Sequence, residues 1–198
     1  MTRVGITGGI GSGKSIVARI LRVMGYPVYD CDKSAARLMR SDRQVISRLT
    51  SLLGDDTYLP DGSLNKAKMS AMLFADSAVR DAVNAIVHPA VIADFLGWCG
   101  SRSGEDLLFV ESAILIESGL LASVDTSIMV TAAPDVRLAR IIARDRIDRQ
   151  QALARMGSQM DDAAKAALCD HIVSNNPGDR LVPQLLGILK SITGKPVE

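Results

Sequence analysis

The sequence has few of the residues that build metal centres, disulfide frameworks and strongly charged surfaces. Its 198 residues include two histidines and three cysteines, and Cys31, Cys99 and Cys169 form neither a CxxC pair nor a Cys/His cluster. This scattered, odd set disfavours a zinc site or a disulfide scaffold and is typical of reduced cytoplasmic thiols. Lysine and arginine number 23 against 22 aspartate and glutamate, which gives a net charge of +1. That balance provides no electrostatic reason to expect a nucleic-acid or membrane partner.

Long apolar runs and targeting signals are also missing from the sequence pattern. No uninterrupted apolar run approaches the roughly 18–20 residues that cross a bilayer. No basic segment followed by an apolar segment and a cleavage site precedes the first predicted strand. Hydrophobic residues make up 47% of the chain, which is ordinary for a globular protein. We therefore expect a cytoplasmic protein. The expected assembly is a monomer or a weak homo-oligomer, which these patterns do not decide.

Five short apolar runs have the length and composition of buried parallel strands. They lie at residues 4–7, 27–29, 107–110, 127–131 and 172–173. Their alternation with helical patterns predicts an α/β fold, a parallel sheet with helices on both faces. Between the second and third runs only helical patterns occur, which predicts an inserted helical subdomain. A break is expected at Ser41 and Asp42, with a helix N-cap there, and a kink or boundary at His88 and Pro89.

A glycine-rich segment follows the first predicted strand. Residues 8–15 read GGIGSGKS and fit the phosphate-binding pattern GxxxxGK[ST]. Glycines let backbone N–H groups wrap phosphates, Lys14 would reach the β- and γ-phosphates, and the Ser15 hydroxyl would coordinate Mg²⁺. The helix that follows points its positive N-terminal end at the same anion. The motif therefore predicts binding of ATP with Mg²⁺ through Gly9, Gly11, Ser12, Gly13, Lys14, Ser15 and Ile16.

Other classes of P-loop protein have less support. A GTPase needs DxxG after a strand and NKxD for guanine, but the DxxG at 94–97 lies in a helical pattern and residues 65–68 read NKAK. The third predicted strand ends in Glu111 without a second acid to activate water, which disfavours a motor or remodelling ATPase. A small-molecule kinase is favoured. It needs an acid near the acceptor hydroxyl, arginines on the transferred group and exclusion of water.

Two acids follow the second predicted strand, Asp30 and Asp32. If that strand neighbours the first, its carboxyl end faces the γ-phosphate crevice. Two residues apart on a strand, the two carboxylates would share one face. We predict that Asp32 is catalytic and that Asp30 is linked to Mg²⁺ or structural; the alternative for either is a helix N-cap. Cys31 would point to the other face and pack there.

Arginines are concentrated between residues 135 and 155. Arg137, Arg140 and Arg144 follow three- and four-residue steps and so line one helical face. Arginine suits bidentate contact with phosphate. We predict that Arg140 and Arg144 belong to a mobile lid that closes over ATP, whereas Arg146 and Arg149 lie on a solvated face.

The chain resembles the dephospho-coenzyme A kinase family over almost its whole length. The glycine-rich loop alone occurs in many families, but the later blocks in this order are more specific. The blocks are residues 4–15, 29–32, 88–89, 111–120, 140–145, 152–155, 159–160 and 170–176. Three places depart from the family pattern. Ile16 replaces a usual Thr, Arg137 replaces a common Gln, and residues 112–114 replace a Pro-Leu-Leu-like run.

This resemblance implies ATP-dependent phosphorylation of the ribose 3′-hydroxyl of 3′-dephospho-CoA, giving CoA and ADP in the last step of coenzyme A biosynthesis. It implies a nucleotide-binding core of residues 1–32, 104–134 and 169–198, a helical acceptor-binding subdomain at 33–103 and a helical lid at 135–168.

The same resemblance implies roles for single residues. Asp32 stands at the catalytic acid, Arg140 acts on the ATP phosphates together with Lys14, and Asn175 lies in a strand near the adenine. His88 and Glu111 would lie near the acceptor. The alternatives are a helix-kink histidine for His88, and an outer Mg²⁺ shell or simple strand-end solvation for Glu111.

Two other functions stay open at this point. One is a kinase for another small acceptor, such as a nucleoside monophosphate, which a product screen separates from dephospho-CoA phosphorylation. The other is a nucleotide-dependent switch that binds a protein partner, which would bind nucleotide without acceptor-dependent turnover.

Overall fold

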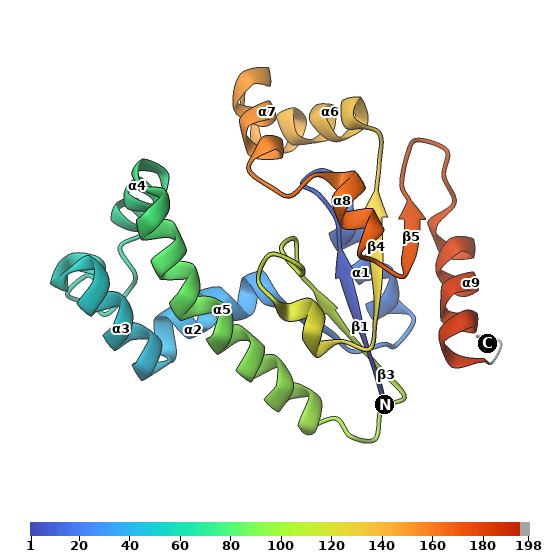
Figure 1. Cartoon of the computed structure of the whole chain (residues 1–198), viewed down its shortest axis with the longest axis horizontal. Coiled ribbons are helices and arrows are strands. Elements are labelled where there is room, and N and C mark those ends of the chain that lie inside the picture. The colour runs from blue at the N-terminus through green and yellow to red at the C-terminus, as the bar shows by residue number, and fades with distance from the viewer. Residues whose placement is uncertain (195–198) are drawn as a thin grey trace. The chain divides into compact units, whose positions relative to one another are not determined.

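The computed structural model describes residues 1–194 and divides the chain into two compact units (Figure 1). The core unit comprises Met1–Tyr29 and the chain from Gly104 onward, and the helical unit comprises Asp30–Ser103. The helical unit covers nearly the same residues for which the sequence shows only helical patterns. Residues 135–168 are not divided from the core unit.

A five-stranded parallel sheet forms the centre of the core unit, with the strand order β2-β3-β1-β4-β5. The strands are β1 (Thr2–Thr7), β2 (Val28–Asp30), β3 (Leu107–Glu111), β4 (Thr126–Thr131) and β5 (His171–Ser174). Each strand overlaps a run predicted from the sequence, so the predicted α/β fold class is confirmed. After β1 the chain forms β2 and then β3 on one side of β1. It then crosses to form β4 and β5 on the other side of β1. The loops after β1 and β3 therefore border the topological switch point, where parallel α/β sheets bind ligands.

Helices cover the sheet because alternate strand residues are apolar on both faces. On one face, Ile6 packs with Leu21 of α1 and Leu185 of α9 in the main hydrophobic core. On the other, Leu115 lies against Gly5 so closely that a Cβ there would come within 2.6 Å of its Cδ2. The helical elements of the core unit are α1 (Lys14–Val23), η2 (Leu120–Ser123), α6 (Pro134–Asp145), α7 (Arg149–Gly157), α8 (Asp162–Ala167) and α9 (Leu181–Thr193).

The helical pattern predicted from 135 to about 168 is broken into α6, α7 and α8. α6 ends where Arg146 adopts a left-handed backbone with φ 53°, and Asp148 begins α7 with a capping box to Gln151. Residues of α6 and α7, with Ile141 and Ala152 fully buried, form a small second core. Ile10 of the glycine-rich loop packs against it.

The helical unit consists of helices grouped around α5. Its helical elements are α2 (Cys31–Ser41), α3 (Arg43–Leu53), η1 (Asp55–Thr57), α4 (Lys66–Ala75) and α5 (Ser77–Gly100). Asp42 separates α2 from α3 and caps α3, accepting hydrogen bonds from the N–H groups of Gln44 and Val45 at 2.9 and 3.0 Å. This confirms the predicted break and cap. α5 contacts α2, α3 and α4 and continues through Pro89. Of the two alternatives predicted at His88 and Pro89, the boundary is therefore wrong and the kink stays a prediction.

α5 is also long and apolar enough, by length and composition, to cross a membrane. Counting uninterrupted apolar runs in the sequence overlooks it, because Arg80, Asp81 and Asp94 interrupt the pattern. The helix packs against three others and its Phe95 is fully buried. The core helix of a helical domain has the same length and composition.

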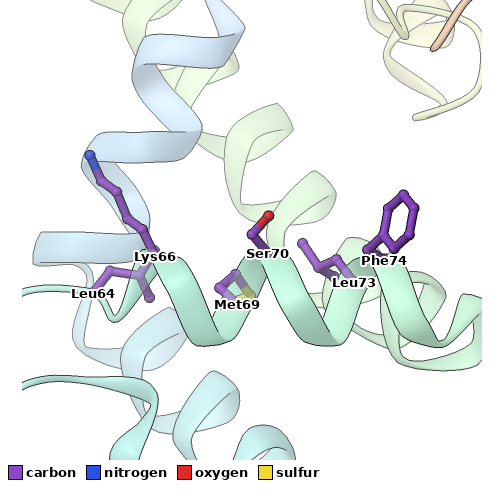
Figure 2. Close-up of a pocket in the computed structure, with 6 residues that line it drawn as sticks. All are labelled: Leu64, Lys66, Met69, Ser70, Leu73 and Phe74. Carbon is purple, nitrogen blue, oxygen red and sulfur yellow. The ribbon is translucent and has the colours of Figure 1, made fainter. Parts of the chain in front are cut away.

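A pocket of about 390 Å³ lies along α4 (Figure 2). Figure 2 shows Lys66, Ser70 and Phe74 projecting to the same side of the helix, as their four-residue spacing requires. Phe74 is 94% exposed, whereas Met69 is buried. The helical unit therefore presents an apolar surface along α4. The lining residues are Leu64, Lys66, Met69, Ser70, Leu73 and Phe74.

Candidate active site

The glycine-rich loop connects β1 to α1 at the carboxyl edge of the sheet. Gly11 and Gly13 adopt φ angles of 81° and 94°, which residues with a Cβ rarely adopt. The N–H of Ser12 bonds to the carbonyl of Gly9 at 3.0 Å and closes a turn. Gly13, the N-cap of α1, provides no side-chain cap, so the first N–H groups of this helix are left for an anion.

Lys14, the first residue of α1, is held by the carboxylate that ends β3. Its Nζ donates a hydrogen bond to Oε1 of Glu111 at 3.2 Å, and Nη2 of Arg22 lies 3.9 Å from Oε2 of the same carboxylate. Glu111 is 8% exposed, so these two cations stabilise its buried negative charge. The structure thus places Glu111 beside the loop lysine, and it adds Arg22, which the sequence patterns did not indicate.

Arg140 of α6 contacts the backbone beneath the loop. Its guanidinium donates to the carbonyls of Gly11, Ser12 and Asn175 at 3.3, 3.4 and 2.8 Å. The side chain of Asn175, just after β5, donates to the Ser12 carbonyl at 2.7 Å. Arg140 and Asn175, both predicted to be site residues, are therefore brought together with the loop.

Arg137 lies three residues before Arg140 in the same helix and is 5% exposed. Its Nε donates to the carbonyl of Ile10 at 2.9 Å, and its Nη1 pairs with Asp162. The Ile10 N–H donates to Oε1 of Gln159 at 2.7 Å. Of the three arginines predicted to line one helical face, Arg137 and Arg140 both donate to carbonyls of the loop. Arg144 pairs with Asp145 instead.

A fully buried lysine joins α8 to the loop after β3. Nζ of Lys165 donates to the carbonyl of Ala113 and to Oε1 of Glu117, both at 2.8 Å. Burial alone would raise the pKa of Glu117, but hydrogen bonds from Lys165 and from the Met160 N–H hold this pKa below its usual value. No periodic or motif signal marks Lys165 in the sequence, because one lysine in a short helical pattern normally indicates a solvated position.

Arg144 is the exposed arginine at the end of α6. Its guanidinium pairs with Asp145 at 2.7 Å, and Arg155 of α7 pairs with the same carboxylate at 2.6 Å. The hydrogen bonds from Arg144 lower the pKa of Asp145 and raise the pKa of Arg144. None of these bonds joins Arg144 to the glycine-rich loop.

The predicted acids of the helical unit differ in role. Asp30 caps α2, accepting a hydrogen bond from the Lys33 N–H at 3.0 Å. Asp32 lies in the first turn of that helix and is exposed. The prediction that the two carboxylates share a strand face is therefore wrong, because β2 ends at Asp30 and α2 begins at Cys31. Cys31 is buried, as predicted. His88 is half-buried in α5, and burial lowers its pKa.

A glycine-rich loop between β1 and α1 of a parallel sheet in this strand order defines a P-loop kinase fold. A family model described as dephospho-CoA kinase matches residues 2–180, and the chain belongs to this family. It is 41% identical to a dephospho-CoA kinase from Porphyromonas gingivalis, over 98% of this chain and 96% of that protein. It is 38% identical to one from Bacteroides fragilis, over 94% and 91%.

A solved structure also matches closely. The crystal structure of a Thermus thermophilus protein is 32% identical, has a TM-score of 0.80 and aligns with 98% of this chain and 96% of its own. The family to which the chain belongs phosphorylates dephospho-CoA with ATP in the last step of coenzyme A biosynthesis.

Proposed function

We propose that this chain transfers the γ-phosphoryl group of ATP to the ribose 3′-hydroxyl of 3′-dephospho-CoA, giving CoA and ADP. The observation that carries the proposal is the phosphate-binding loop with Lys14 at the sheet's switch point, in a chain of this family. In the transfer, the acceptor oxygen forms a bond to the γ-phosphorus. The bond to the β–γ bridging oxygen breaks, and ADP leaves.

Lys14 supplies the positive charge for this step. Phosphoryl transfer depends mainly on positioning and on electrostatic stabilisation of the transferred group. To reach a phosphate, the Lys14 ammonium must exchange the Glu111 carboxylate for phosphate oxygens. Arg22 then remains as the cation beside Glu111. Arg140, already bonded to the loop backbone, adds charge next to the nucleotide.

Asp32 accepts the proton of the acceptor hydroxyl. Its carboxylate is exposed in the first turn of α2, and no hydrogen bond within the described residues ties it to another group, so it is able to meet a substrate. A carboxylate base contributes by taking the proton as the new oxygen–phosphorus bond forms. Asp30, in contrast, serves the helix as its cap.

Magnesium fits the site as an ion that enters with ATP. Ser15 is exposed in the first turn of α1, where its hydroxyl can join a coordination shell. Within residues 1–194 no group of three or more His, Cys, Asp or Glu could hold a metal ion. Mg²⁺ is usually bound by one or two protein oxygens together with substrate phosphates, and when bound it neutralises part of their charge.

The two units divide the substrates in this proposal. The core unit binds ATP, with Asn175 toward the adenine, Ile16 beside the loop, and residues 135–168 closing as a lid that includes Arg144. The helical unit binds dephospho-CoA, with His88 toward the acceptor, and Glu111 of the core unit is also directed to the acceptor. The protein acts in the cytoplasm as a monomer or weak homo-oligomer, without a nucleic-acid or membrane partner.

The test is acceptor-dependent ADP release from ATP and Mg²⁺ with 3′-dephospho-CoA, with CoA detected by mass. Dephospho-CoA lacking the 3′-hydroxyl is the matched control acceptor and should give no product. Turnover only with AMP or CMP would show that the protein is a kinase but that dephospho-CoA is not its acceptor. Nucleotide binding without turnover on any acceptor would favour a nucleotide-dependent switch.

A further inference from the structure

Ile10 occupies an unspecified position of the phosphate-binding motif, yet the structure holds it at three points. Its N–H donates to Gln159 at 2.7 Å, and its carbonyl accepts from Arg137 at 2.9 Å. Its side chain packs against the small core made by α6 and α7. A residue fixed by its amide, its carbonyl and its side chain has little freedom left, so the first half of the loop is held from outside.

The guanidinium of Arg137 also lies directly against the loop backbone. A Cβ added to Gly9 would collide with Nη2 of Arg137 and come within 2.8 Å of Oδ1 of Asp162. A Cβ on Gly11 would come within 2.7 Å of the Arg137 carbonyl. Gly9 does not have a left-handed φ, so a side chain here would act by displacing Arg137 and Asp162 from the loop and not by straining the backbone.

The partner of Arg137 is itself anchored. Asp162 is the first residue of α8, and the same helix carries Lys165, which is fully buried. Lys165 bonds to Ala113 and Glu117 in the loop that follows β3. β1 and β3 are neighbours in the sheet. α8, bonded to Arg137 through Asp162 and to the loop after β3 through Lys165, therefore connects the loops that follow β1 and β3.

We propose that Arg137 is a positioning residue for phosphoryl transfer: together with Asp162 it fixes the glycine-rich loop at Gly9 and Ile10, in the shape that receives the nucleotide phosphates. Arg137 reaches the nucleotide only through the loop, so its charge serves Asp162 and the Ile10 carbonyl. The proposal rests on the phosphoryl transfer proposed above only where turnover is measured. The effect of Arg137 on nucleotide binding is measured without any acceptor.

The experiment compares Arg137→Gln, Asp162→Asn and the double variant with the wild type. The probe is the β,γ-imido analogue of ATP with Mg²⁺, and its Kd is measured by calorimetry. Losing a buried, charge-assisted hydrogen bond that shapes the loop should raise the Kd about tenfold in each single variant. Because each residue acts through the other, the double variant should raise the Kd by much less than the product of the two single effects. The matched control is Arg80→Met, an exposed arginine of α5 in the helical unit, which should leave the Kd unchanged.

Steady-state kinetics separate positioning from general loss of structure. Arg137→Gln should raise the KM for ATP and lower kcat while the KM for dephospho-CoA stays within about twofold of the wild-type value. Thermal unfolding reports whether each variant is folded. If Arg137→Gln does not fold, the Kd of Asp162→Asn for the analogue tests the proposal instead, because asparagine keeps the shape of the carboxylate. A folded variant whose Kd for the analogue equals that of the wild type, or single effects that simply multiply, would overturn the proposal. If wild-type turnover with dephospho-CoA is absent but the Kd changes as expected, the acceptor assignment fails and the positioning role stands.

Discussion

Nζ of Lys14 lies 3.2 Å from Oε1 of Glu111, so the cation of the phosphate-binding loop is held by a carboxylate of the neighbouring strand. The pair keeps the ammonium partly buried, with 14% of the lysine side chain and 10% of the glutamate side chain exposed. An arriving phosphate must compete with Glu111 for Lys14, and Arg22 is the cation that stays with the carboxylate.

Lys14→Met should nearly abolish phosphoryl transfer. Removing the cation from the transferred group should lower kcat by about a thousandfold, because electrostatic stabilisation supplies most of the rate acceleration in this chemistry. Coupled ADP release with saturating ATP and dephospho-CoA measures the effect. Lys190→Met, an exposed lysine of α9, is the matched control and should retain wild-type kcat. Activity near that of the wild type in Lys14→Met would contradict the assignment of the loop.

Asp32→Asn should lower kcat by roughly 10²–10⁴-fold, the range for loss of a general base. The KM for ATP should stay within about twofold of the wild-type value, because the substitution keeps the size of the side chain and removes only its proton affinity. Initial rates over both substrates give the two constants. Asp55→Asn, another exposed aspartate of the helical unit, serves as the control. Near-normal kcat in Asp32→Asn would remove Asp32 from the reaction.

The ion pair of Lys165 and Glu117 should be asymmetric in its effect on stability. Glu117→Ala should lower the free energy of unfolding by about 2 kcal/mol, because a fully buried ammonium keeps only the Ala113 carbonyl. Lys165→Met should lower it by about 1 kcal/mol or less, since the Glu117 side chain is 25% exposed and can be hydrated. Urea unfolding monitored by circular dichroism measures both. Equal losses would show that the buried charge is not the cause.

The same pair predicts a pH dependence. Because the pKa of Glu117 is lower in the folded state than in the unfolded chain, the folded state favours the carboxylate. Its contribution is therefore complete above the ordinary glutamate pKa of about 4.3 and is lost as the pH falls below it. The difference in unfolding free energy between wild type and Glu117→Gln should be constant from pH 6 to 8, by the same linkage, and should shrink below about pH 4. A difference that grows at low pH would contradict this sign.

Gly9→Ala should weaken nucleotide binding, because the new methyl group displaces the Arg137 guanidinium from the loop. We expect the KM for ATP to rise about tenfold, as for the loss of the buried hydrogen bonds of Arg137. Gly104→Ala is the matched control. Gly104 has open space around its Cα and no left-handed φ, so the KM should not change. An unaltered KM in Gly9→Ala would mean that Arg137 can move aside without consequence.

The strands and the phosphate-binding loop could be predicted from the sequence because both are local signals. A short apolar run such as 107–110 indicates a buried strand without reference to the rest of the chain. GGIGSGKS likewise brings the glycines of a turn and a lysine together within eight residues. The ends of helices are harder to predict from the sequence. Pro89 interrupts the hydrogen-bond pattern of a helix, yet α5 continues through it because packing against three other helices stabilises both halves.

Contacts between distant parts of the chain could not be predicted from the sequence. Arg137 has the same helical spacing as Arg140 and Arg144, but tertiary packing buries it against Ile10, 127 positions away. Lys165 is buried for a similar reason, since its partners lie 52 and 48 positions earlier in the chain. The sequence does not show where β2 ends and therefore favours a strand position for Asp32. In the structure Asp30 caps α2, so Asp32 belongs to the helix.

Ile10 accepts one hydrogen bond from the start of the α6–α7 hairpin and donates another to the segment just after it, through Arg137 and Gln159. Both ends of the hairpin are therefore fastened to one residue of the phosphate loop. The proposed lid is therefore coupled to the shape of the loop through Ile10: a phosphate that shifts the loop also shifts the hairpin.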